Sequence, residues 1–429
     1  MPALQPAGYA ALLHRSIMAA MSTAPLPTAP VAASAFPALS RGRRALVLTA
    51  LTLGGFAIGT SEFAGMGLMP NMAAELGVSA PEVGHLISAY ALGVVVGAPL
   101  LAILGGALKR KTLLLALMAF YALGNLASAL GPDYGNLILF RFIAGLPHGA
   151  YFGVAALTAV SISPPEARGR AVSLVMLGLT LAILVGTPLA TWTGQLVSWR
   201  WAFAAVSLIS LVTVALIAWS LPAGVDGPRE RPLDELRAFN RLPVWQALLI
   251  GAIGFAGMFA VFSYLAPTMV EVTGVAPAWI PLGVAGFGLG GVIGNMLGGW
   301  LFDRLQFRAV PVVLAWAVAM LLLFPLAAQQ PWSLMLATVC IGMMGALGPI
   351  LQSHLMDVAE GAQTLAAASH HAAFNTANAL GPWLGGMAIS AGMGWTSTGF
   401  VGASTAVAGL LIWTWAMRTR SNRQACPAL

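Results

Sequence analysis

The sequence predicts an all-α membrane protein with twelve transmembrane helices in two six-helix bundles, and three observations support that class. Hydrophobic residues fill 59% of the 429 positions and charged residues only 8%, whereas roughly a quarter of an ordinary soluble domain is charged. Long apolar stretches follow one another along almost the whole chain. The basic residues gather in every second connection between those stretches, which is typical of membrane topology.

Each apolar stretch is long enough to cross a hydrocarbon core of about 30 Å as a helix. Their continuous apolar character differs from the alternating pattern of a membrane β-barrel. In the first half, the expected spans are 45–67, 83–105, 112–131, 136–160, 171–195 and 201–221. In the second half, they are 245–268, 279–302, 309–328, 332–355, 366–392 and 396–417.

A polar linker near the middle divides the chain into two parallel repeats of six spans. We expect an N-terminal bundle over 45–221, a cytoplasmic linker over 222–244 and a C-terminal bundle over 245–417. Residues 1–44 are expected to form a disordered cytoplasmic tail, and residues 418–429 a short cytoplasmic one.

The net charge is +7, but the basic residues lie in short connections between apolar stretches and do not cluster on a soluble face that could bind nucleic acid. Basic residues precede span 1, separate spans 2 and 3, separate spans 4 and 5, lie in the central linker, and follow spans 8 and 12. The intervening connections carry Glu75, Glu82, Asp133 and Glu271, with Arg200 as their one basic residue. The positive-inside rule therefore predicts that both termini are cytoplasmic, in a multi-pass protein of a bacterial inner membrane.

Two charged residues fall inside the predicted spans, Glu62 in span 1 and Arg141 in span 4. A charge within the bilayer costs several kcal/mol, so such side chains face the protein interior and usually have a function. Both lie in the same half of the bilayer, where an ion pair between them would cross the N-terminal bundle. The functional interpretation is a protonatable carboxylate whose partner changes with conformation. The alternative is a static pair that orients the helices.

His148 follows Arg141 by two helical turns and shares nearly the same helix face. It is a candidate proton relay or substrate ligand, and the alternative is a neutral imidazole with a structural hydrogen bond. Gly145, Gly149 and Gly153 recur at intervals of four residues. This spacing predicts close approach of a neighbouring helix.

Polar side chains in the second half are candidates for a substrate cavity. They are Tyr264, Gln352, Asn375 and Asn378. Phenol and amide groups around a central cavity suit a neutral polar ligand, and the alternative for each residue is hydrogen bonding between helices. The sequence contains no P-loop, H-E-x-x-H or G-x-S-x-G motif. We therefore expect no catalytic residues, no cofactor, no metal and no enzyme activity.

Several stretches, in order and at the right spacing, are similar to one known family. They are GTSEF (59–63), SAYALGVVVGAPL (88–100), RFIAGLPHGAYFG (141–153), GLTLAILVGTPLATWTGQ (178–195) and QTLAAASHHAAFNTANALG (363–381). On these, the chain resembles the major facilitator superfamily, and within it the drug:proton antiporter and sugar-efflux group that includes arabinose-efflux-type permeases.

The resemblance also assigns gating motifs. Gly186 and Pro188 match the antiporter motif, while Gly299, Asp303 and Arg304 match the motif that follows span 8. The equivalent stretch after span 2, GGALKRK (105–111), lacks the acidic residue that the family normally has there. This difference puts the gate contact of the first half in doubt.

The resemblance implies a secondary active transporter that exports a small organic molecule in exchange for protons by alternating access. The expected partners are that molecule, protons and the lipid bilayer, without nucleic acid, and the protein is expected to be a monomer. An importer or facilitator with the same fold is one alternative. A membrane sensor built on a transporter fold is another, although such sensors usually carry an added soluble domain.

Overall fold

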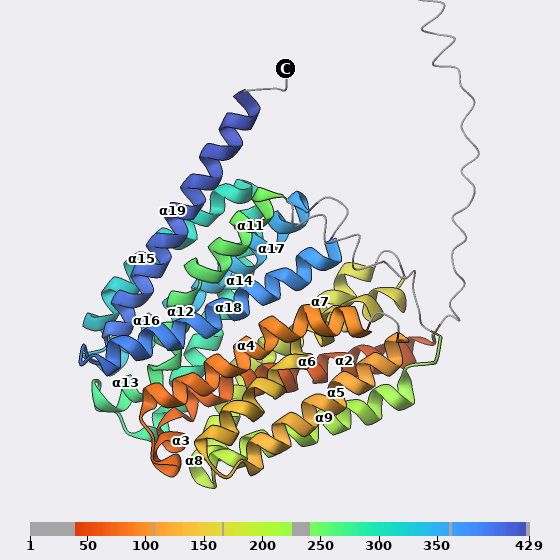
Figure 1. Ribbon diagram of the computed structural model, residues 1–429, viewed down its shortest axis with the longest axis horizontal. Coiled ribbons are helices and arrows are strands. Elements are labelled where there is room, and N and C mark those ends of the chain that lie inside the picture. The colour runs from red at the N-terminus through yellow and green to blue at the C-terminus, as the bar shows by residue number, and fades with distance from the viewer. Residues whose placement is uncertain (1–38, 106–107, 165–166, 225–240, 360–362, 426–429) are drawn as a thin grey trace, which may run out of the picture. The chain divides into compact units, whose positions relative to one another are not determined.

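The computed structural model describes residues 39–105, 108–164, 167–224, 241–359 and 363–425 (Figure 1). Within these ranges, every regular element is a helix. The expected linker at 222–244 and the expected N-terminal tail lie mostly outside the described residues.

The first half contains six long helical segments joined by short connections. They are α2 (Arg41–Gly67), α4 (Ala80–Gly105), α5 (Arg110–Leu130), α6 (Tyr134–Ser161), α7–η2–α8 (Arg168–Leu181, Ala182–Gly186 and Thr187–Leu196) and α9 (Trp199–Ser220). The short helix α3 (Met69–Leu76) connects α2 to α4.

The second half repeats this arrangement. Its segments are α11–η4–α12 (Leu242–Leu249, Ile250–Gly254 and Ala256–Ser263) with the short α13 (Leu265–Glu271), α14 (Ile280–Leu305), α15 (Ala309–Ala327), α16–η7–α17 (Pro331–Gly342, Met343–Ala346 and Leu347–Val358), α18 (Gln363–Ser390) and α19 (Ser397–Ala425). The single turns η5 (Pro277–Trp279) and η6 (Gln306–Arg308) lie before and after α14.

Ten segments of the described residues are long and apolar enough to cross a membrane. One of them, Pro277–Ala327, contains both α14 and α15. The more polar α18 is a further long helix in the described chain. The described helices are therefore consistent with twelve spans, and their bounds lie within a few residues of the expected ones.

Capping residues explain where some helices begin. The Ser40 hydroxyl accepts a hydrogen bond from the backbone N–H of Arg43 at 3.3 Å, so α2 starts a little before the expected residue 45. Asp133 caps α6 by accepting from the backbone N–H of Asn136 at 2.9 Å. This bond and a second one from the Asn136 side chain hold the pKa of Asp133 below its usual value. At the other end of the chain, α19 continues to Ala425, beyond the expected residue 417.

The helix ends rich in basic residues are joined to one another, and we call this end of the molecule the basic side. In the first half, Arg43 Nε donates to the Ser220 carbonyl at 2.8 Å and Lys111 Nζ to the Leu221 carbonyl at 2.6 Å. At the opposite side, Arg200 forms an ion pair with Glu75 at 2.7 Å and donates to the Gly131 carbonyl.

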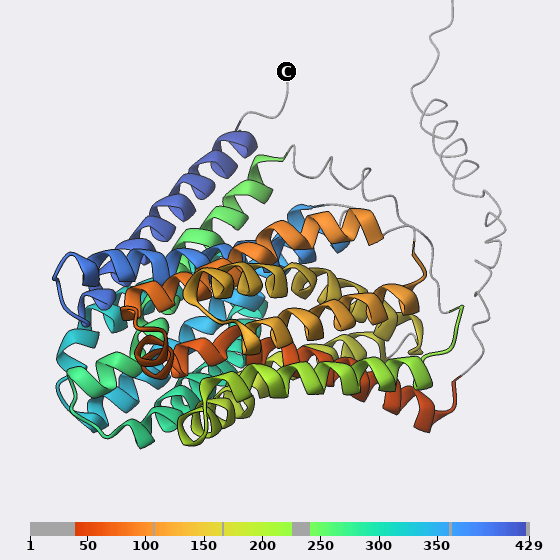
Figure 2. The same cartoon turned by 60° about the horizontal axis from the view of Figure 1, so that its bottom comes forward.

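The two halves meet through α4 and α18, which run side by side in Figures 1 and 2. The Ser88 hydroxyl donates to the Ala379 carbonyl at 2.8 Å. Closer to the opposite side, the buried Tyr264 hydroxyl donates to the Pro382 carbonyl at 2.7 Å and lies against Gly84 of α4. The halves are therefore in direct contact on the side away from the basic helix ends.

Candidate functional site

Arg141 is buried inside the first half, where it bonds to Ser61, the residue that precedes Glu62 on α2. Its guanidinium donates to both the hydroxyl and the backbone carbonyl of Ser61, each at 2.9 Å. It also lies over the rings of Tyr90 and Phe203, with its central carbon 4.3 and 4.8 Å from the ring centroids. Two hydrogen bonds and two aromatic faces stabilise this buried cation.

Glu62 is also buried, with 1% of its surface exposed, but its partner is in the other half of the molecule. Its Oε1 accepts a hydrogen bond of 3.0 Å from the side-chain amide of Asn378 on α18. The expected ion pair between Glu62 and Arg141 is wrong for this structure, since the two side chains are not within ion-pair distance. The prediction that both charges face the protein interior agrees with their burial.

The rotation of α2 explains why the expected pair does not form. Successive residues of an α-helix point about 100° apart. Ser61 points to Arg141 within the first half, so Glu62 points to Asn378 across the boundary between the halves. The carboxylate therefore lies where movement of one half against the other must change its surroundings.

His148 belongs to a chain of buried hydroxyl and imidazole groups beside Arg141. The Tyr90 hydroxyl lies 3.0 Å from His148 Nδ1 and 3.0 Å from the Tyr121 hydroxyl. Tyr121 in turn donates to the backbone carbonyl of Ile58 on α2. The chain connects α2, α4, α5 and α6 within one bundle, and it links His148 to the helix that carries Glu62.

A second contact between the halves lies nearer the basic side. The ring of Phe152 on α6 is stacked on the imidazole of His371 on α18, with centroids 5.7 Å apart and planes 8° apart. Phe152 also contacts His148, at 5.3 Å between ring centroids. α18 therefore contacts the first half through His371, Asn378 and Ala379, at successive levels along its length.

The predicted cavity residues lie in different environments. Asn378 contacts Glu62, and Asn375, one turn earlier, donates to the His371 carbonyl of its own helix. The side-chain carbonyl oxygens of both asparagines are buried and have no hydrogen-bond partner among the residues that the structure describes. Tyr264 is fully buried where the halves meet, and Gln352 of α17 is half-buried. The structure thus brings Asn378 to the Glu62 carboxylate and leaves two amide oxygens free to accept a hydrogen bond.

Four residues of this region were not among the site residues predicted from the sequence: Ser61, Tyr90, Tyr121 and Asn125. Asn125 is buried in α5 against the Ser61 hydroxyl, and its polarity within an apolar span was a usable signal. Serine and tyrosine are common residue types in apolar helices, so only the structure shows that Ser61, Tyr90 and Tyr121 lie around Arg141.

A family model for the major facilitator superfamily matches residues 51–314 and 285–427, which together cover most of α2 and all the later long helices of both halves. The chain belongs to the major facilitator superfamily.

Relatives and a solved structure agree with that membership. The inner membrane transport protein YdhP of Escherichia coli K12 is 38% identical over 366 residues, which cover 85% of this chain and 94% of that protein. A probable sugar efflux transporter of Helicobacter pylori is 27% identical, covering 85% of this chain and 92% of that protein. A bacterial homologue of the human lysosomal transporter Spinster has the same fold, with a TM-score of 0.71 at 17% identity, covering 89% of this chain and 98% of that one. This protein is therefore a multi-pass inner membrane transporter.

The stretch that resembles the antiporter motif, at Gly186 and Pro188, lies at an interruption of the α-helix. Pro188 has no N–H to continue the α-helical pattern, and the five residues before Thr187 form a π-helical turn that ends at Gly186. A side chain at Gly186 would collide with the Thr60 hydroxyl and the Phe56 ring of α2. Gly186 thus allows close packing of the interrupted helix against α2, two residues from Glu62.

The motif after α14 is less enclosed. Gly299 has open space beside it, and the exposed Asp303 forms no ion pair among the residues that the structure describes. Arg304 lies over the Trp300 ring, 4.2 Å from its centroid. A gating role for Gly299, Asp303 and Arg304 remains a proposal from the resemblance.

Proposed function

We propose that this transporter exports a small organic molecule and that inward movement of protons drives the export. The observation that carries the proposal is the buried Glu62 carboxylate, which bonds to Asn378 across the boundary between the two halves. A proton taken up or released there changes a contact that exists only while α2 and α18 are close together.

The chemistry of the pair gives this change a direction. An ionised Glu62 accepts a charge-assisted bond from the Asn378 amide, which contributes about 1.5–3 kcal/mol, whereas a bond between neutral groups contributes about 0.5–1.5 kcal/mol. Protonation therefore weakens the contact between the halves. A protonated Glu62 can instead donate to the Asn378 carbonyl oxygen, which has no partner in the structure. The amide thus accommodates both protonation states, so that the protonated protein can also close this contact and carry its proton inward, while ionisation of Glu62 strengthens the contact by about 1 kcal/mol.

In this scheme Arg141 does not release Glu62 directly. It stays bonded to Ser61 and keeps a fixed positive charge beside the carboxylate. We propose that His148 and its tyrosine partners transfer protons or orient Arg141, and that Gln352, Asn375 and Tyr264 contribute to substrate contacts. We propose from the positive-inside rule that the basic side is cytoplasmic, so that the contacts between α4 and α18 would close the external side of the site.

The relative described as a sugar efflux transporter supports outward transport of a polar small molecule. A ligand panel of sugars, nucleosides and antibiotics, scored by thermal stabilisation of the purified protein, identifies the substrate, since a ligand that binds only the folded state raises the apparent stability.

The mechanism is tested in proteoliposomes with pH gradients of either sign. We expect the wild-type protein to move substrate against the direction of proton flow. We expect Glu62→Gln to retain exchange of labelled for unlabelled substrate but to lose acceleration by the gradient, because glutamine preserves the hydrogen bond and cannot be ionised. Gradient-driven transport by Glu62→Gln at the wild-type rate would refute the coupling role. Movement of substrate with the protons would instead show import.

A further inference from the structure

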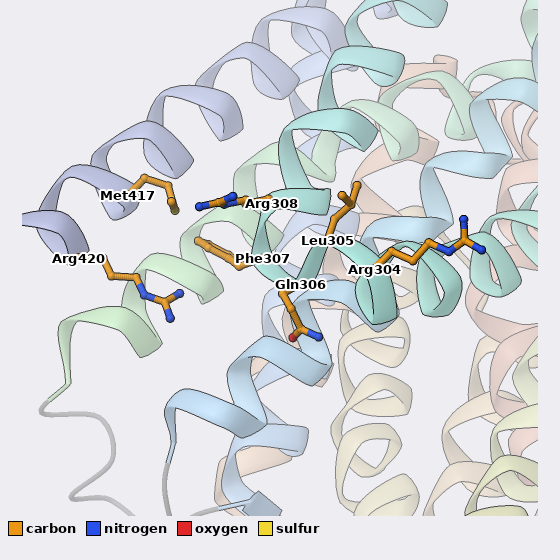
Figure 3. Close-up of a pocket in the computed structure, with 7 residues that line it drawn as sticks. All are labelled: Arg304, Leu305, Gln306, Phe307, Arg308, Met417 and Arg420. Carbon is orange, nitrogen blue, oxygen red and sulfur yellow. The ribbon is translucent and has the colours of Figure 1, made fainter. Parts of the chain in front are cut away.

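A cavity of about 570 Å³ lies at the basic side of the second half, away from the proposed transport site. It lies between the end of α14, the turn η6 and the last turns of α19 (Figure 3). Its lining combines three arginines with apolar side chains. The lining residues are Arg304, Leu305, Gln306, Phe307, Arg308, Met417 and Arg420.

Two of the arginines present their charges to this cavity. In Figure 3, Arg308 and Arg420 lie on either side of the Phe307 ring, whereas Arg304 extends away from it. Arg304 is stacked on Trp300. Neither Arg308 nor Arg420 forms an ion pair with any acidic residue that the structure describes, and both are exposed. The cavity thus contains two guanidinium groups whose charges are not neutralised by any acidic residue in the described part of the chain.

The base of the cavity is well packed. Phe307 is 5% exposed, and its ring is stacked on His354 of α17 with centroids 3.8 Å apart. Trp413 of α19 donates from Nε1 to the Phe307 carbonyl at 3.0 Å. These contacts pack α17, η6 and α19 against one another, so the backbone positions of Arg308 and Arg420 are fixed relative to each other.

The position along the helices places the cavity at the bilayer surface. The candidate span that ends the chain runs from Ser397 to Arg420, and η6 connects the two helices of the span Pro277–Ala327. Trp300, Val312 and Trp415 on these helices are exposed apolar side chains, as expected of a surface that faces lipid. Exposed tryptophans of this kind are typical of the membrane–water interface.

We propose that this cavity binds the headgroup of an anionic phospholipid from the leaflet on the basic side. Guanidinium groups bind phosphate through two parallel N–H donors, and two arginines match a phosphodiester or a pair of phosphates. The apolar lining by Leu305, Phe307 and Met417 suits the glycerol and the first carbons of the acyl chains. Basic pockets between transmembrane helices at this depth commonly hold such headgroups. A free phosphate ion would use the same arginines but not the apolar lining.

The test measures lipid binding to the purified full-length protein in mild detergent, by native mass spectrometry and by thermal stabilisation. The probes are phosphatidylglycerol, cardiolipin, phosphatidylcholine of matched chain length, glycerol 3-phosphate and inorganic phosphate, at constant ionic strength. We expect phosphatidylglycerol or cardiolipin to bind at least about tenfold more tightly than phosphatidylcholine. The double variant R308Q/R420Q should abolish that preference.

Arg418 provides a matched control, because it is exposed on α19 but does not line the cavity. Arg418→Gln should therefore keep the lipid preference, and Arg304→Gln should change it little. If R418Q lost the preference for anionic lipid as fully as R308Q/R420Q, the preference would come from general surface charge, and the proposed site would be refuted. Equal stabilisation by inorganic phosphate and by phosphatidylglycerol would show an anion site without a lipid component. Because binding is read without transport, failure of the coupling mechanism at Glu62 would leave this result unaffected.

Discussion

At the scale of single residues, Arg141 illustrates how a buried charge is stabilised without a carboxylate partner. Isolated ionic groups are costly in an apolar interior. Here the guanidinium bonds to the hydroxyl and the carbonyl of one residue, Ser61, and lies on the faces of Tyr90 and Phe203. This arrangement leaves Glu62 free to bond with the other half of the molecule.

The bond between Arg141 and Ser61 can be measured with a double-mutant cycle. Arg141→Met removes the cation at similar side-chain length, and Ser61→Ala removes the hydroxyl. We expect Ser61→Ala to lower the free energy of unfolding by about 1–3 kcal/mol. The two changes should be coupled by about 1–2 kcal/mol, because they remove the same hydrogen bond. The measurement is thermal or denaturant unfolding in mild detergent.

Ser128 supplies the control for this cycle, because it is equally buried and, among the described residues, its hydroxyl bonds only to the Gly124 carbonyl of its own helix. Ser128→Ala should add to Arg141→Met within about 0.5 kcal/mol. A coupling energy below about 0.5 kcal/mol between Ser61→Ala and Arg141→Met would contradict the hydrogen bond between these two side chains.

At the scale of helices, close packing depends on glycines at particular levels. Gly145 of α6 faces α4 so closely that a Cβ atom would overlap the backbone carbonyl of Tyr90, and one at Gly149 would lie against Ala98. Gly153, four residues further on, has nothing within 4 Å. The predicted spacing of small residues therefore serves helix packing at the first two positions, while the third is open.

This difference predicts opposite results for two identical changes. Gly145→Ala should lower the free energy of unfolding by at least about 2 kcal/mol, because the added methyl group meets a backbone atom that cannot turn away. Gly153→Ala should be neutral or stabilise by up to about 1 kcal/mol through better helix propensity. The melting temperatures of the two variants in the same detergent test this, and equal values would be inconsistent with the packing described here.

At the scale of the whole molecule, contacts between the halves are unevenly distributed along α18. The Ala379 carbonyl accepts a hydrogen bond from the Ser88 hydroxyl, and the side-chain amide of the neighbouring Asn378 donates one to Glu62. Beyond these, Tyr264 and Pro382 lie on the opposite side from the basic ends. Alternating access by this transporter requires these contacts to separate during each cycle.

A reversible cross-link tests that requirement. Ser88→Cys and Ala379→Cys are introduced into a chain in which Cys340 and Cys426 are replaced by serine. Because the Ser88 hydroxyl lies 2.8 Å from the Ala379 carbonyl oxygen, oxidation should form a disulfide and reduce transport by more than about tenfold, and reduction should restore it. The single-cysteine variants should be insensitive to oxidant. Full transport by the oxidised double variant would show that this boundary does not open.

Composition and hydropathy along the sequence predict spans that agree with most of the described helix bounds to within a few residues, and they predict the interior position of Glu62 and Arg141. These properties depend on local composition: an apolar stretch of sufficient length must cross the bilayer, and a charge within it must avoid lipid. The family motifs added the superfamily, which the family model confirms.

The partner of each buried charge, in contrast, is evident only from the folded structure. Nearly uniform apolar helices carry little information about their rotation, and a turn of about 100° exchanges one residue for the next. That rotation directs Ser61 to Arg141 and Glu62 to Asn378, from the far half of the chain. The cavity at Arg308 and Arg420 likewise depends on α19 lying beside η6, more than a hundred positions away in the sequence.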